Sequence, residues 1–289
     1  MGEVSRTLAH ARKLGTLSRE EERSVTHGDF WVPEAERALY KMALTALNGA
    51  GIAYVVAGAY AIYEHTGIYR ETKDLDIFVC PGDVTRTLAF FQERGYQTEL
   101  TFPHWLGKVL CGPGVIDVIF SSGNSIARVD ADWFAHARDA EVLGVPVRVC
   151  PPEEMIWSKA FVQERERFDG ADVMHLIYQF GAALEWRRLI DRFDLHWRVL
   201  FGFVVLFGFV YPDQRHRVPQ WVIDELTARF LREQSDETDS VCNGTLLSRE
   251  QYLYDVCVRG YQDARVIPHG HMKPEELEIW TAAIRDKNE

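Results

Sequence analysis

The sequence predicts an α/β fold of the α+β kind, with a small mixed-sheet core followed by a helical domain. Short apolar strands alternate with amphipathic helices up to about residue 150. The pattern then becomes helical at Pro151-Pro152-Glu153-Glu154, which places proline in a first helical turn and acids at the positive end of the helix dipole. The chain has 289 residues, 47% of them hydrophobic, so it can bury a sizeable core.

The first half of the chain contains the expected sheet. Apolar residues recur at helical spacing from Pro33 to Ala50, and Gly49 to Gly51 ends this helix. Shorter helices are expected over 60–65 and from 83 to 91. Runs of β-formers and alternating apolar residues predict strands at 52–57, 73–79, 96–100, 105–111, 114–120 and 145–149.

The second half is expected to be helical, over roughly 153–165, 170–180, 184–193, 196–210 and 219–233. The most apolar run, Val199 to Val210, is shorter than the roughly 18 to 20 residues of a membrane span, so it predicts a buried core helix. We therefore expect an extension over 1–30, an α/β core over 31–150, a helical domain over 151–235, and a linker and tail over 236–289 that packs back on the body.

Charge and cysteine usage narrow the class of protein. The formal net charge is −11, which argues against a general basic surface that coats nucleic acid but leaves room for a local basic groove. Five scattered cysteines without metal spacing suit a reducing compartment. The first 22 residues are charged and lack an apolar signal core. We therefore expect a cytoplasmic protein that does not engage a membrane.

Three acidic residues form the candidate catalytic site. Alternation along the strand places Asp74 and Asp76 on one face, where a divalent cation would offset their repulsion. Asp117 interrupts the apolar run 115–120, and a buried aspartate there needs a partner or a metal. Its alternative role is a carboxylate satisfied by an arginine or by backbone N–H groups. If the two strands are neighbours, the three carboxylates form a site for Mg²⁺ and triphosphate.

A glycine turn precedes these acids. Gly58 follows a short apolar strand and opens a helix. Without a side chain it lets the backbone approach a triphosphate, and the N–H groups of the helix N-terminus supply positive potential. The residues expected to assist phosphate binding are Ala59, Arg70, Thr72, Lys73 and Lys159. Arg70 and Lys73 could equally be solvated charges, and Lys159 could extend to the surface from its helix.

These motifs together resemble the polymerase-β-like nucleotidyltransferase superfamily. The sequence of residues 70–77, Arg-Glu-Thr-Lys-Asp-Leu-Asp-Ile, is similar to the corresponding motif of the bacterial branch that includes abortive-infection toxin nucleotidyltransferases. In that branch a helical lysine and an Asp-x-x-Asp follow the catalytic sheet, as do Lys159 and Asp169 to Asp172 here. The residues themselves favour helix capping for Asp169 and Asp172. The resemblance covers roughly residues 35–180.

The resemblance implies a function. Family members use Mg²⁺ and an NTP co-substrate to transfer a nucleoside monophosphate to a hydroxyl on tRNA, a protein or a small molecule. It also implies a toxin-like role with an antitoxin partner. A tRNA acceptor would need a basic groove, for which the candidates are Arg165, Arg167, Arg187 and Arg188, whereas a cationic antibiotic would need an acidic pocket.

One residue departs from the family pattern. The turn usually reads Gly-Gly or Gly-Ser, whereas here it is Gly58-Ala59, which removes a phosphate-binding hydroxyl but keeps the backbone N–H. A non-catalytic nucleotide-binding or interaction module on the same fold is therefore the alternative function. A third reading is an interaction scaffold built on the helical half.

Overall fold

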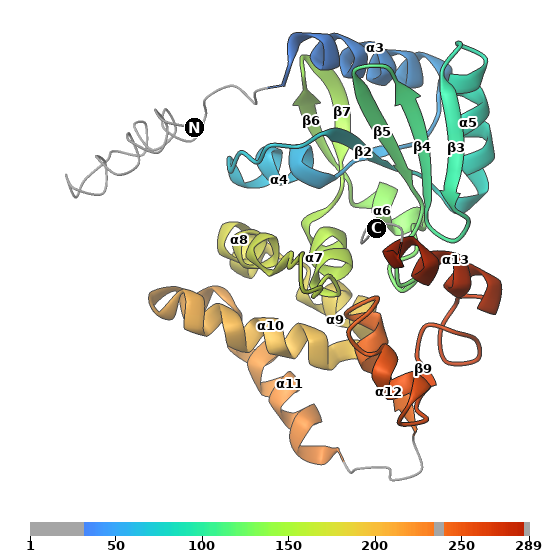
Figure 1. Ribbon diagram of the computed structural model, residues 1–289. Helices are drawn as coiled ribbons and strands as arrows, with labels where there is room; N and C mark the ends of the chain where they lie inside the picture. Colours follow the sequence, from blue (N-terminus) through green and yellow to red (C-terminus); the bar gives the residue numbers. More distant parts are fainter. Residues whose placement is uncertain (1–31, 234–239, 286–289) are drawn as a thin grey trace.

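The computed structural model describes residues 32–233 and 240–285. The predicted extension over 1–30, and residues 234–239 of the predicted linker, lie outside the described residues. The predicted fold class is confirmed, because the chain forms a mixed sheet followed by helices (Figure 1).

A seven-stranded sheet organises the first half, with the strand order β3-β4-β5-β2-β1-β7-β6. β2 runs parallel to β5 and antiparallel to β1, while β4 and β5 form a hairpin. The strands are β1 Val55–Val56, β2 Asp74–Phe78, β3 Gln97–Phe102, β4 Leu106–Cys111, β5 Gly114–Ile119, β6 Arg138–Val142 and β7 Val145–Val149.

The two faces of the sheet differ in chemistry. Helices α3 (Glu34–Ala50) and α5 (Val84–Gln92) cover one face, where Cβ atoms built at Gly114 and Gly107 would meet Tyr40 of α3 and Leu88 of α5. The side chains of Leu75 and Ile77 point to this face and are fully buried. Because side chains alternate along a strand, Asp74 and Asp76 point to the opposite face.

The helical half lies below the sheet in Figure 1, and α4 (Gly58–Thr66) lies between the sheet and α8. Its helices are α7 Pro152–Ala160, α8 Gly170–Phe180, α9 Trp186–Phe193, α10 Trp197–Val210 and α11 Gln220–Arg232. Short 3₁₀ turns are Pro81–Asp83, Gly181–Ala183, Asp194–His196, Pro212–Arg217 and Asn243–Leu246. The predicted helices therefore begin and end within a few residues of the observed ones.

Helix α10 is only half buried, which corrects the prediction of a buried core helix. Phe203 and Phe207 are buried against the neighbouring helices, whereas Val205 is 61% exposed and Phe209 is 78% exposed. Within the described residues, the segment Trp186–Val210 is long and apolar enough to cross a membrane by length and composition alone. Only one third of its most apolar window is buried, because the helix packs along a single face.

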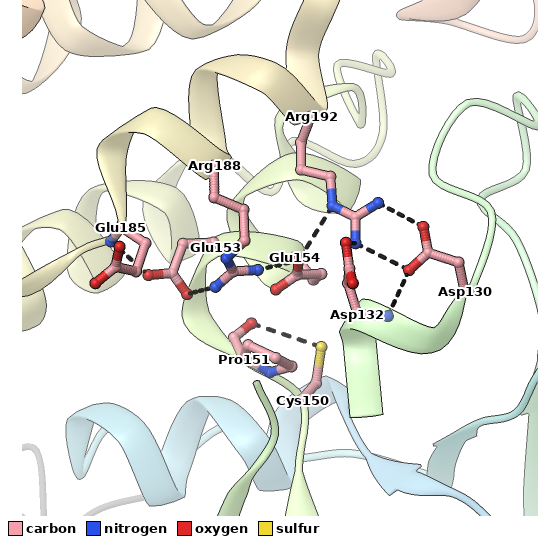
Figure 2. Close-up of polar contacts among 9 residues, drawn as sticks. All are labelled: Asp130, Asp132, Cys150, Pro151, Glu153, Glu154, Glu185, Arg188 and Arg192. Carbon is pink, nitrogen blue, oxygen red and sulfur yellow. Dashed lines mark hydrogen bonds and ion pairs between the residues drawn. The ribbon is translucent and has the colours of Figure 1, made fainter. Parts of the chain in front are cut away.

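An ion-pair network holds α7 against α9 (Figure 2). Arg188 bonds both Glu153, at 2.8 Å, and Glu154. Arg192 Nε lies 3.2 Å from Glu154 Oε1, and its Nη2 atom lies 2.9 Å from Asp130 Oδ1, just before α6 (Ala131–Ala135). Glu154 is fully buried, and a buried carboxylate persists only when it is paired. The network therefore fixes α9 to α7 and to the segment before α6.

The C-terminal segment returns to the sheet (Figure 1). It contains β8 Val241–Cys242, α12 Leu253–Cys257, β9 Gln262–Asp263 and α13 Pro274–Arg285. The Trp280 ring of α13 lies 4.8 Å from the Phe102 ring of β3 and 5.4 Å from the Trp105 ring, measured between centroids. Aromatic contacts thus join α13 to the edge of the sheet.

Candidate active site

The strand register brings the second and third acids together. Asp76 of β2 is paired directly with Asp117 of β5, and Asp74 is paired with Val115. Side chains of directly paired residues lie on the same face of a sheet. Asp74, Asp76 and Asp117 therefore share the face opposite α3 and α5, as the sequence predicts.

Gly58 lies against Asp76. The backbone N–H of Ala57 donates to the carbonyl of Asp76 at 3.0 Å, which holds the turn beside the strand. Gly58 has a φ of +58°, and a Cβ built there would overlap Asp76 Oδ2 and come within 2.7 Å of Cγ. Both the left-handed conformation and the close approach require glycine. The N-terminus of α4, which begins at Gly58, receives no side-chain cap.

The pKa of the Asp76 carboxyl group is shifted far above its ordinary value. Burial, and then the negative charges of Asp74 and Asp117, raise its pKa to about 7, against the pull of Lys159 and Arg167. Among the described residues, no ion pair is formed by Asp74 or Asp76. Over residues 32–233 and 240–285, the pair of carboxylates therefore has no cation in ion-pair contact.

Asp117 has such a partner. Lys108 of β4 is its register partner, and Lys108 Nζ donates to Asp117 Oδ1 at 2.8 Å. Burial raises the pKa of Asp117, and the Lys108 contact opposes that shift. The alternative role predicted for Asp117, a buried carboxylate satisfied by a cation, is thus present, with a lysine in place of an arginine.

A second cluster of charges lies beside the acids. Lys159 of α7 contacts Asp169 Oδ2 at 2.8 Å and Asp172 Oδ2 at 2.9 Å. Arg70 bonds Asp172 at 2.6 Å, and Arg167 bonds Asp169 at 3.0 Å. Burial raises the pKa of Asp169, but Lys159 and Arg167 outweigh it and bring that pKa to about 2. Five charges from three segments therefore form one cluster next to Asp76.

This cluster corrects two expectations. Asp169 occupies the N-cap position of α8 but makes no side-chain capping hydrogen bond, because its carboxylate binds Lys159 and Arg167. Lys159 does not extend to the surface, since its side chain is only 15% exposed. Asp169 and Asp172 therefore bind Lys159, and these side chains neither cap the helix nor extend into solvent.

The remaining predicted residues divide into two groups. The Thr72 hydroxyl donates to Asp74 Oδ1 at 2.7 Å, and so orients that carboxylate. Ala59 is in the first turn of α4. Lys73 is exposed, and its carbonyl accepts from the Tyr40 hydroxyl at 3.3 Å. The structure thus places Thr72 and Ala59 at the acids and leaves the Lys73 side chain toward solvent.

Each of the four arginines that were candidates for a basic groove is paired with a carboxylate. Arg188 is bound within the α7–α9 network, and Arg187 pairs with Glu225 at 2.8 Å. Arg165 is highly exposed and lies 3.8 Å from Glu166. Arg167 instead belongs to the charge cluster, where Asp169, Asp76 and Asp74 raise its pKa.

Lys108 is a partner of the candidate site that the sequence did not predict. A signal for it exists in the two-residue turn Gly112-Pro113 between β4 and β5. Counting outward from Cys111 and Gly114, the hairpin pairs Lys108 with Asp117.

The acids fit a metal ion that takes some of its ligands from the protein and the others from a bound substrate. Within the described ranges, no group of three or more His, Cys, Asp or Glu side chains is arranged to hold a metal ion on its own. Mg²⁺ commonly uses one or two carboxylates together with substrate phosphates and water. Asp74 and Asp76, which have no ion-pair partner among the described residues, match that donor set.

Comparisons with known proteins give distant structural neighbours. No family model and no curated protein matches the chain. The antibiotic-resistance factor ANT(2'')-Ia is 16% identical with a TM-score of 0.39, over 64% of this chain and 97% of that one. The lincosamide antibiotic adenylyltransferase LnuA is 16% identical with a TM-score of 0.36, over 50% of this chain and 96% of that one. A nucleotidyltransferase-like protein from Paracoccidioides brasiliensis is 14% identical with a TM-score of 0.38, over 63% and 90%.

These neighbours are nucleotidyltransferases or are described as similar to them.

Proposed function

We propose that this protein is a cytoplasmic, Mg²⁺-dependent nucleotidyltransferase that moves a nucleoside monophosphate from an NTP to a hydroxyl acceptor. The observation that carries the proposal is the contact between Gly58 and Asp76. It brings the uncapped N-terminus of α4 against a strand that presents Asp74 and Asp76. Phosphate binds at such a helix N-terminus, and two carboxylates beside it suit the metal of a nucleoside triphosphate.

Each residue has a role in this reaction. The N–H groups at Gly58 and Ala59 hold the triphosphate, and Asp74 and Asp76 hold Mg²⁺. When bound, Mg²⁺ neutralises phosphate charge and stabilises the leaving pyrophosphate. The acceptor oxygen forms a bond to the α-phosphorus as the bond to the bridging oxygen breaks, and Asp117 receives the hydroxyl proton.

The basic cluster has a supporting role. The positive charges of Lys159 and Arg167 already act on Asp76 and lower its pKa. Arg70 is 39% exposed at its side chain, so it can turn from Asp172 toward a phosphate group. Lys73 is close in sequence to Asp74 and is free to act on the same phosphates. Asp169 and Asp172 position the cations.

The acceptor is a hydroxyl on tRNA, a protein or a small molecule. A toxin-like role with an antitoxin partner is supported by the sequence resemblance alone. Because each of the four candidate arginines is paired with a carboxylate, an RNA acceptor would have to displace those pairs or use other basic residues. Salt dependence of RNA binding separates the acceptors, since phosphate contacts weaken steeply with salt.

The test is transfer from labelled NTPs to a panel of tRNA, protein and aminoglycoside acceptors. We expect transfer to one acceptor class with Mg²⁺, and its loss in Asp76→Ala. Transfer that persists in Asp76→Ala would reject the assignment. Lys41→Ala, which changes an exposed lysine of α3, is the matched control and should retain transfer.

The second candidate is a nucleotide-binding module without turnover. Ala59 favours it, because it stands where the turn of the resembled family has glycine or serine and provides no hydroxyl to a phosphate. Calorimetry that shows Mg²⁺–NTP binding, together with no transfer to any acceptor, would favour this function over the first.

A further inference from the structure

One row of side chains crosses four strands at the candidate site. Asp76 is paired with Asp117, Asp117 with Lys108, and Lys108 with Glu99. Paired side chains lie on the same face of a sheet. The row therefore consists of two aspartates, a lysine and a glutamate, and Lys108 lies between Asp117 and Glu99.

Lys108 forms its ion pair with Asp117 rather than with Glu99. Its ammonium lies 2.8 Å from Asp117 Oδ1, whereas the Glu99 carboxylate accepts from the Thr101 hydroxyl at 2.7 Å. The Lys108 side chain is 28% exposed and that of Asp117 is 12% exposed. Charged hydrogen bonds with little solvent access are among the strong ones. One of the two Asp117 oxygens is thus occupied by a protein cation.

The contact between Lys108 and Asp117 bears on how many metal ions the site can bind. In two-metal sites one ion lies at the attacking oxygen and the other at the leaving oxygen, roughly 3.5–4 Å apart. An ion at the attacking side would have to share Asp117 with Asp74 and Asp76. The ammonium of Lys108 already neutralises Asp117, and it repels a second divalent ion at the same carboxylate.

We propose that Lys108 is a positioning residue that replaces one of the two ions of a two-metal site, so that this chain uses a single divalent ion. The inference rests on the proposed function. The single ion lies on Asp74 and Asp76 with the triphosphate. Lys108 holds Asp117 by Oδ1 and leaves Oδ2 to accept the proton of the acceptor hydroxyl.

Electron paramagnetic resonance of Mn²⁺ tests this directly, on the full chain with an NTP analogue that cannot be cleaved between the α- and β-phosphates. Two Mn²⁺ ions at the spacing of a two-metal site give a spin-coupled spectrum, and one ion does not. We expect one uncoupled Mn²⁺ per wild-type chain. Lys108→Met should bind a second, coupled ion because Asp117 is released, whereas Lys108→Arg should keep one.

The outcomes separate the two proposals. Two coupled ions in the wild-type chain would overturn the inference regardless of how the variants fold. A single ion in folded Lys108→Met would also overturn it, since Lys108 would then not be what excludes the second ion. If no variant and no wild-type chain binds Mn²⁺ with the nucleotide, the metal-dependent function itself fails and the inference fails with it.

Discussion

The Asp76 carboxylate lies against the α-carbon of Gly58, close enough that no side chain fits between them. This contact joins the helix N-terminus that would hold phosphate to the carboxylate that would hold its metal. It also means that one glycine decides both the local fold and the chemistry.

Gly58→Ala should therefore lower the stability of the protein for two reasons, and it should also weaken NTP binding. The left-handed backbone costs a non-glycine residue about 1–2 kcal/mol, and overpacking against Asp76 adds about 1–3 kcal/mol. Urea unfolding should show the loss of stability, and calorimetry should show loss of NTP binding.

Gly49→Ala is the matched control for that variant. A Cβ at Gly49 meets nothing within 4 Å, and the residue lies in helix α3, where alanine is favoured by about 0.5–1 kcal/mol. If Gly58→Ala proves as stable as Gly49→Ala, the close approach of Gly58 and Asp76 is wrong.

Asp76→Asn should change how stability depends on pH. The folded-state pKa of about 7 lies above the ordinary value of 3.8, so the folded protein favours the protonated acid. Wild-type stability then falls as pH rises from about 4 to about 7. Asparagine removes this penalty, and we expect the variant to be more stable by about 2–4 kcal/mol at pH 8.

The measurement for Asp76→Asn is thermal unfolding at pH 4 and pH 8 in a chelator. The two proteins should be equally stable at pH 4 and differ at pH 8. A difference of the same size at both values would show that the effect is steric rather than electrostatic.

Lys159→Met should destabilise the protein by about 1.5–3 kcal/mol, because it removes the buried cation that Asp169 and Asp172 share and leaves each of them with one arginine. Adding Asp172→Asn should recover part of the loss, and a double-mutant cycle measures that coupling. Arg165→Ala removes an exposed pair with Glu166 and should cost under about 1 kcal/mol. A cycle without coupling would contradict the charge cluster.

Two neighbouring arginines make a matched test of the α7–α9 network. Arg188 is 16% exposed at its side chain and bonds two buried glutamates, whereas Arg187 is 69% exposed and bonds Glu225. Arg188→Met should cost about 3–5 kcal/mol, and Arg187→Met about 1 kcal/mol or less. Equal losses in chemical denaturation would mean that the network does not hold the helices together.

Much of the fold could be read from local signals. Periodicity, glycines and prolines predicted β2, β4, β5, β7 and the helices from α7 to α11. Strand β6 was missed because it is an edge strand whose residues 138–141 are exposed or only partly buried, so it lacks an apolar pattern. Helix α10 was expected to be buried because its composition is apolar all round, although in the part of the chain that the structure describes only one of its faces is buried.

Much of the candidate site was also readable, because the acids fall on strands whose alternation is local. The partners of those acids were not. Asp169 was predicted to cap α8, but its carboxylate binds Lys159 of α7 and Arg167, two residues before it, in place of the helix N–H groups. Pairings between distant side chains depend on tertiary packing, which no local pattern records.

The most direct test of the central claim compares NTPs labelled at the α-phosphate with NTPs labelled at the γ-phosphate. A nucleotidyltransferase should move the α-label to the acceptor and release the γ-label in pyrophosphate, and Asp76→Asn should abolish both. Transfer of the γ-label, or transfer of the α-label that survives Asp76→Asn, would contradict the account.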